Sequence, residues 1–277
     1  MFRLFQRRKL HSITGLCCDK LTLLSVSEQI KPMSQVEFDM ANQSLEELYD
    51  WLADKVSTNI GYGGHFNLQQ AAKHRLLDTV AALMESASLP VLFANDGESL
   101  LHALPMVASQ GRELGFIHIS RSLDIKPTLE PEKGSLFHFV LQRSQQSRLF
   151  CLGVDSDNQD PKLLDYAEDL GCDWLSVNEC HFRSRFTVKQ QLSHYLSHCD
   201  DVVINIDLAS LQPVTRLESD TLIEVQMVNR VLRQVLLSGK VRLVQFVGYK
   251  DKHIYSKETL GVVNGLASLF PSHHRAA

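Results

Sequence analysis

The clearest hydrophobic pattern in the chain lies in the segment 202–208. Five apolar residues, four of them β-branched, surround the polar residues Asn205 and Asp207. A continuous apolar run of this length is typical of a strand that is buried on both faces. The pattern therefore predicts a central strand that delivers a carboxylate at its carboxyl end.

Similar apolar runs recur along the chain and alternate with stretches of helical spacing. Strands are expected at 21–26, 89–94, 115–120, 148–154, 173–177, 202–207 and 241–247. Helices are expected at 43–56, 67–86, 98–112, 135–146, 161–170, 187–198, 221–238 and 257–270, with loops at 27–40 and 57–66. Strands separated by helices predict βαβ units. The predicted fold class is therefore α/β: a three-layer α/β/α arrangement with a mostly parallel central sheet.

Capping residues agree with several of these limits. Asp160 followed by Pro161 predicts a helix start, and Gly171 predicts its end. The segments 67–70 and 221–224 both match the capping-box pattern, and Gly239 follows the last turn of the second of these helices.

Composition restricts the class of protein. The 277 residues carry a net charge of −4, which argues against a general nucleic-acid binder. No apolar run approaches the roughly 18 residues needed to cross a membrane, and six cysteines without a CxxC pair predict reduced thiols in the cytoplasm. We expect one domain over 1–277, with 1–20 peripheral or disordered; a short basic amino terminus is favoured over an organelle transit peptide.

Three acids follow predicted strands or open the next helix. Glu98, Asp124 and Asp207 come after the strands at 89–94, 115–120 and 202–207. The carboxyl ends of parallel strands share one edge of the sheet, where open α/β sheets place their ligands. The acids are therefore expected to outline one site.

The order and spacing of these segments resemble the arginase family, the ureohydrolases that include arginase, agmatinase and formimidoylglutamase. The resemblance covers roughly 60–270 and includes Gly134–Phe137, which is similar to the family's HG(S/T)PF segment. It implies an arginase-like fold. In that family, GGDHS, DAHxD and SxDxDxxDP motifs hold two manganese ions, which activate a bridging hydroxide.

Several of the ligands implied by the resemblance are replaced in this chain. Glu98 stands in place of the first-motif histidine. Ser120 and Ser122 stand in place of the bridging aspartate and the histidine of the second motif, and Ala209 replaces an aspartate of the third. Serine and alanine do not replace a carboxylate as strong ligands, so a two-manganese centre is not expected.

The remaining ligand positions group around one of the two metal positions that the resemblance implies. That position keeps Glu98, Asp124 and Asp207, three oxygen donors of the kind that Mg²⁺, Ca²⁺ or Mn²⁺ prefers. We therefore expect either no metal or one divalent cation. Without a cation, the mutual repulsion of three acids would raise at least one pKa.

Lysine and histidine residues give weaker candidates. Lys133 occupies the place of the family's histidine before Gly134, a position that implies proton transfer or substrate handling, and His65 is a candidate substrate-binding residue in a glycine-rich loop. His194 and His198 have the i, i+4 spacing of a zinc pair, but no glutamate lies between them. We interpret this pair as part of a polar helix face.

The leading functional hypothesis is a divergent, formimidoylglutamase-like protein with a degraded metal centre. It would be catalytically inactive or regulatory and would bind a small amidino, guanidino or amino-acid-like ligand. Two alternatives stay open: an active hydrolase of linear amidines with a single-metal site, and a structural or interaction protein that keeps only the fold. The resemblance also implies a homo-oligomer.

Overall fold

The computed structural model describes residues 18, 20–56, 60–70, 72–108, 111–143, 146–213 and 222–270. The basic amino terminus and Thr221, on which some expectations rested, lie outside the described residues. No helix in the described ranges has the length and apolarity to cross a membrane.

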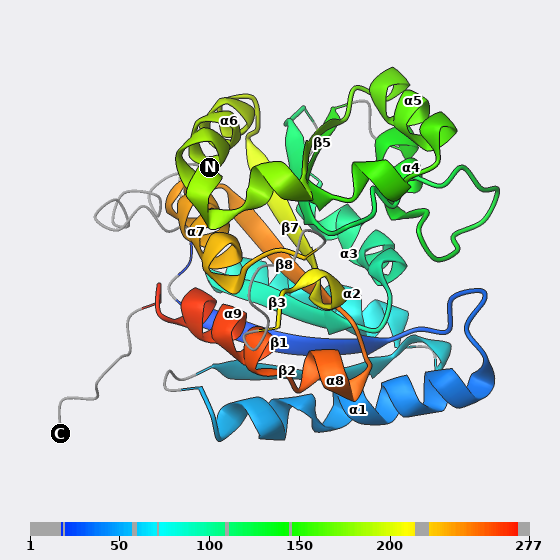
Figure 1. Ribbon diagram of the computed structural model, residues 1–277. Coiled ribbons are helices and arrows are strands. Elements are labelled where there is room, and N and C mark those ends of the chain that lie inside the picture. Colours follow the sequence, from blue (N-terminus) through cyan, green and yellow to red (C-terminus); the bar gives the residue numbers. More distant parts are fainter. Residues whose placement is uncertain are drawn as a thin grey trace, which may run out of the picture.

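The described chain forms one eight-stranded sheet in which every pair of neighbouring strands is parallel (Figure 1). The strands are β1 (Lys20–Ser27), β2 (Gly61–Asn67), β3 (Ser88–Ala94), β4 (Leu114–Ile119), β5 (Ser147–Val154), β6 (Asp173–Ser176), β7 (Asp201–Asp207) and β8 (Val241–Val247). Their order across the sheet is β2-β1-β3-β8-β7-β4-β5-β6. The α/β class and the parallel central sheet are thus confirmed.

Helices cover both faces of the sheet. They are α1 (Gln35–Ala53), α2 (Lys73–Glu85), α3 (Leu100–Val107), α4 (Leu136–Arg143), α5 (Pro161–Asp169), α6 (Arg185–Ser197), α7 (Val225–Leu237), α8 (Asp251–Ile254) and α9 (Lys257–Ala267). Buried residues of α1, α6, α7 and α9 form one core cluster with one face of the sheet. Those of α2, α3, α4 and α5 form a second cluster with the other face. The result is the three-layer arrangement that the alternation of strands and helices predicts.

Several expected elements differ from the structure. The helix expected from Asn67 (α2) begins at Lys73, because Asn67 accepts from the Gln69 N–H and opens a 3-10 turn (Leu68–Gln70) in place of the expected capping box. The segment expected as a loop at 57–66 contains β2, whose glycines lack the apolar pattern of a strand but allow close packing on β1; a Cβ on Gly63 would lie 2.3 Å from a methyl of Leu24. Helix α1 begins at Gln35, inside the expected loop 27–40, because Ser34 forms a capping box with Glu37. Helix α7 begins at Val225, four residues after the expected start, and its N-cap residue Glu224 makes no capping bond.

The central strands β3, β8, β7 and β4 end almost level with one another. Ala94 of β3 pairs with Val247 of β8, and Val247 also pairs with Asp207 of β7. Although β3 and β4 are consecutive in the chain, β8 and β7 lie between them. The helices that follow β3 and β4 pack on one face of the sheet, and those that follow β7 and β8 pack on the other. The loops at the carboxyl ends therefore diverge and leave a crevice between them.

Candidate functional site

A cavity of about 410 Å³ lies at the carboxyl ends of these central strands. All seven residues of the predicted metal site and its surroundings line it: Glu98, Ser120, Ser122, Asp124, Lys133, Asp207 and Ala209. The chain thus brings together side chains that are more than 100 residues apart in sequence. Proximity does not assign their roles, so ligation of a metal by the three acids stays a prediction.

Glu98 lies in a short 3-10 turn (Gly97–Ser99) between β3 and α3, and only 2% of the residue is exposed. Its Oε1 accepts a hydrogen bond from the backbone N–H of Ser135 at 2.8 Å. Burial, followed by hydrogen bonding and repulsion from Asp96, raises the pKa of Glu98 to about 10. Burial also raises the pKa of Asp96. Glu98 is therefore a neutral carboxylic acid at pH 7.

Asp124 has the opposite charge state. Burial favours its neutral form, but the bond and charge of His118, together with Ser122 and Lys133, lower the pKa of Asp124 below its usual value. His118 Nε2 lies 3.2 Å from Asp124 Oδ2. The backbone of Asp124 has a φ of +49°, a left-handed conformation that aspartate tolerates better than most residues. This turn aims the carboxylate back at β4.

His118 is fully buried on β4. The Asn205 side-chain amide lies with its Nδ2 3.1 Å from His118 Nδ1. With Nδ1 held against this amide, the Nε2 atom of His118 faces Asp124. Asn205 on β7 thus orients His118 toward the ionised carboxylate.

Asp207 ends β7 and caps the 3-10 turn that follows it (Leu208–Ser210). Its Oδ1 accepts from the Ala209 N–H and its Oδ2 from the Ser210 hydroxyl, both at 2.9 Å. Burial raises the pKa of Asp207 despite these two bonds. The carboxylate therefore has protein donors on both oxygens.

The serines at the positions of lost ligands bond to the backbone. Ser120 Oγ accepts from the Ser122 N–H at 3.2 Å, and Ser122 Oγ accepts from the Asp124 N–H at 3.3 Å. In the described part of the chain, no three His, Cys, Asp or Glu side chains form a group that could hold a metal ion. The Ser120 and Ser122 hydroxyls, engaged in turns, and the methyl group of Ala209 do not fit the ligand positions of a two-manganese centre.

Two buried amides on β7 and β8 were not predicted as site residues: Asn205, which lines the cavity, and its neighbour Gln245. Asn205 and Gln245 are register partners on β7 and β8, and each is at most 1% exposed. Gln245 donates to the Gly97 carbonyl at 3.0 Å. Neither Asn205 Oδ1 nor Gln245 Oε1 has a hydrogen-bond partner among the described residues. In the sequence, each of these amides is marked only by being a polar residue within an otherwise apolar strand.

Cationic groups form another part of the cavity wall. Lys133 lines it together with Lys250 and His253, which follow β8 and belong to or adjoin α8. Burial, followed by the charge of Lys252, lowers the pKa of His253. The short helix α8 had no clear pattern in the sequence, so Lys250 and His253 were missed. Acceptors and cations thus share one small cavity.

The other histidine candidates lie elsewhere. His65 is on the edge strand β2, where Ser25 and Asn42 lie within hydrogen-bonding distance of its ring nitrogens at 2.9 and 3.1 Å, and it does not line the cavity. The rings of His194 and His198 lie 4.9 Å apart on exposed positions of α6 and its end, as expected for a polar helix surface.

Comparison with known proteins gives a consistent family. No family model matches the chain. A formimidoylglutamase from Psychrobacter cryohalolentis is 26% identical over 214 residues, which cover 74% of this chain and 58% of that protein. One from Rhodococcus opacus is 24% identical over 191 residues, which cover 64% of this chain and 60% of that protein. The match thus spans less than two thirds of either relative.

Solved structures share the fold. The arginase from Bacillus subtilis superposes with a TM-score of 0.67 at 16% identity, covering 90% of this chain and 98% of the other. The formimidoylglutamase from Bacillus subtilis gives 0.68 at 14% identity, covering 96% and 94%. Sequence similarity to formimidoylglutamases and this common fold together place the chain in the arginase/ureohydrolase family.

Proposed function

We propose that this chain is a catalytically inactive or regulatory ureohydrolase-family protein that binds a small amidino, guanidino or amino-acid-like ligand in the cavity at the strand ends. The observation that carries the proposal is the unsatisfied amide oxygen of Asn205, a buried residue that lines the cavity together with acids. A buried acceptor without a donor costs free energy. A ligand that brings N–H groups would remove that cost.

Amidinium and guanidinium groups match this environment. They are planar, positively charged and carry only N–H donors, so they fit carboxylates and carbonyl oxygens but not other donors. Ionised Asp124 supplies charge, and Asn205 supplies a neutral acceptor. Lys133 and Lys250 on the same cavity would receive the carboxylate of an amino-acid-like ligand.

Loss of ureohydrolase activity is proposed from the donor set. A hydroxide that bridges two metals needs bridging carboxylates, and Ser120 and Ala209 occupy positions where the family has aspartates. A single hard cation lowers the pKa of water less than a bridged pair does. Binding would therefore survive where hydrolysis does not.

Ligand binding can be measured by thermal unfolding and calorimetry with arginine, agmatine and formimidoylglutamate. A ligand present at about 100 times its Kd should stabilise the folded chain by about 2.7 kcal/mol. The Asp124→Asn variant should lose most of this effect, whereas the exposed Asp165→Asn on α5 should keep it. Equal binding by both variants would place the ligand elsewhere, and no binding by the wild type would refute the proposal.

The alternative hydrolase would use one cation at Glu98, Asp124 and Asp207, which do line a common cavity. Assays with the same three compounds distinguish this alternative from the inactive assignment. Release of urea, ammonia or formamide with Mn²⁺, Mg²⁺ or Ca²⁺, lost on chelation and in Asp207→Ala, would replace the inactive assignment. Stabilisation by a cation without product release would give a single-metal binding protein.

A further inference from the structure

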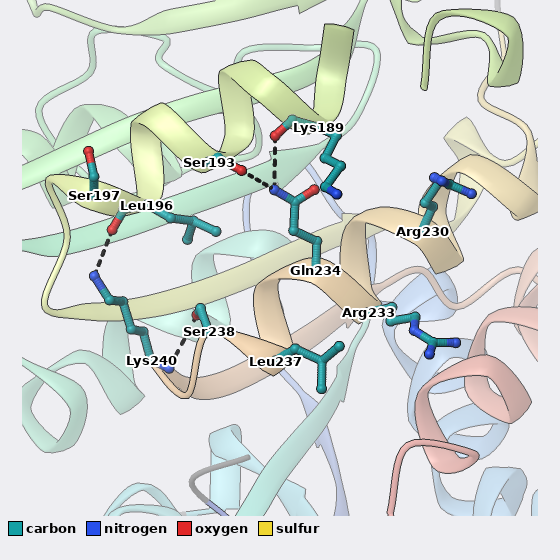
Figure 2. Close-up of a pocket in the computed structure, with 10 residues that line it drawn as sticks. All are labelled: Lys189, Ser193, Leu196, Ser197, Arg230, Arg233, Gln234, Leu237, Ser238 and Lys240. Atoms are coloured by element: carbon teal, nitrogen blue, oxygen red, sulfur yellow. Dashed lines mark hydrogen bonds between the residues drawn. The ribbon is translucent and has the colours of Figure 1, made fainter. Parts of the chain in front are cut away.

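A basic groove lies between α6 and α7, away from the strand-end cavity. It encloses about 680 Å³ and is lined by four cationic side chains and no acidic one: Lys189, Arg230, Arg233 and Lys240. Figure 2 shows that Gln234 joins the two helices by donating to the Lys189 carbonyl at 2.9 Å and to the Ser193 hydroxyl at 2.8 Å. The walls of the groove are thus fixed by the protein itself.

Three of the four cations are available to a partner. Lys240 donates to the carbonyls of Leu196 and Cys199 and is engaged within the chain. Lys189, Arg230 and Arg233 are exposed, and no described acid forms an ion pair with them. Helices α6 and α7 together carry four Lys and Arg residues and no Asp or Glu.

Exposed apolar side chains accompany this charge. Phe186 is 65% exposed, with the guanidinium carbons of Arg185 and Arg230 lying 4.6 and 5.9 Å from its ring centroid. Leu237, at the other end of the groove, is 44% exposed. An inorganic anion would neutralise the cations but would leave these apolar groups in water. The surface therefore fits a partner that is both acidic and apolar.

Helix α1 has those two properties. It carries five acids and no Lys or Arg, and its Val36 and Met40 are 69% and 62% exposed. Glu46 and Asp50 are like charges at i, i+4, which destabilise a helix. Asp50 also lies in the last turn, where the helix dipole disfavours negative charge and no basic residue compensates it. Cations from a partner would relieve both effects.

The acidic helix and the basic groove lie on the same face of the molecule. Helices α1, α9, α7 and α6 follow one another across that face, so α9 separates the two charged surfaces (Figure 1). A two-fold axis near α9 would bring each surface onto its complement in a second copy. We propose that two copies of this chain associate face to face, with α1 of each lying over α6 and α7 of the other.

This arrangement is a closed, isologous dimer in which every contact occurs twice. It uses opposite charge to set the register and the exposed apolar residues to bury surface. Because the charged groups are exposed, the association should weaken as salt screens them.

Sedimentation velocity of the full chain tests the proposal. The wild type should be dimeric at about 50 mM salt and shift toward monomer at about 500 mM. Glu46→Lys/Glu47→Lys and, separately, Arg230→Glu/Arg233→Glu should each raise the dissociation constant at least about tenfold. Combining all four substitutions restores opposite charges and should recover the dimer.

The control matched to Glu46→Lys/Glu47→Lys is Glu168→Lys/Asp169→Lys on α5, which makes the same change in net charge at exposed positions on the other face of the sheet. It should leave the dimer intact. A monomeric wild type at low salt would overturn the proposal, and binding of a polyglutamate peptide by that monomer would assign the groove to a separate acidic partner. The proposal would also be overturned if neither charge reversal weakened the dimer, or if the combined variant failed to recover it.

Discussion

Replacing Glu98 by glutamine should reduce the dependence of stability on pH above pH 5. In the folded chain, burial and Asp96 raise the pKa of Glu98 from 4.5 to about 10, so the native state holds a proton that the unfolded chain releases. Stability from this group is fully present below pH 4.5 and is lost as pH rises toward 10. A glutamine side chain is neutral throughout and can still accept from the Ser135 N–H.

The size of the effect follows from the pH interval. Between pH 4.5 and pH 7, one proton released on unfolding corresponds to about 1.4 kcal/mol per pH unit, or about 3 kcal/mol as an upper limit. The wild type should therefore lose up to about 3 kcal/mol more than Glu98→Gln over this range. At pH 7 the variant should be the more stable protein.

Urea unfolding followed by circular dichroism at pH 5, 6, 7 and 8 would measure this difference. Glu85→Gln, at an exposed position on α2, is the matched control and should follow the wild type. Parallel stability curves for Glu98→Gln and the wild type would show that Glu98 is ionised in the native state. That result would refute the neutral carboxylic acid and would favour a bound cation.

Further predictions concern packing and capping. Gly265→Ala should destabilise the chain by about 1–3 kcal/mol, because its Cβ would lie 2.2 Å from Asn229 Oδ1 and force α9 away from α7. Gly261→Ala should cost less, because its Cβ would lie 3.2 Å from Val225 Cγ1, its nearest neighbour. Equal unfolding free energies would contradict that packing. Asp207→Ala should cost about 1 kcal/mol through the lost cap, measured by urea unfolding at pH 7; an unchanged midpoint would mean that the capping bonds do not contribute.

The fold was largely predictable because buried parallel strands leave a strong sequence signal. Strand β7 has an apolar residue at four of its seven positions, all β-branched, and Asp160 with Pro161 marked the start of α5 at the right residue. Strand β2 gave no such signal. Glycine is needed in β2 because this strand packs closely against side chains of β1. The sequence of β2 alone does not show how close its neighbour lies.

The cavity was predictable in part for the same reason. Glu98, Asp124 and Asp207 follow the ends of central strands, and parallel topology brings such ends together. Their charge states depended on tertiary neighbours: Asp96 and burial for Glu98, and His118 for Asp124. Local sequence spacing alone could not supply these pairings.

Restoring the family's ligands should restore a metal centre. The variant Glu98→His/Ser120→Asp/Ser122→His/Ala209→Asp supplies an imidazole or carboxylate at each substituted position and should gain manganese if the surrounding cavity accommodates it. Mass-spectrometric metal analysis after dialysis would give manganese per chain. A variant that folds but binds no more manganese than the wild type would show that further residues have changed.

The most direct test of a degraded metal centre is manganese stoichiometry of the wild-type chain itself. Protein purified without chelator, incubated with excess Mn²⁺ and then desalted should retain at most about one ion per chain, since only one of the two metal positions keeps three acidic side chains. Two tightly held manganese ions per chain would contradict this interpretation.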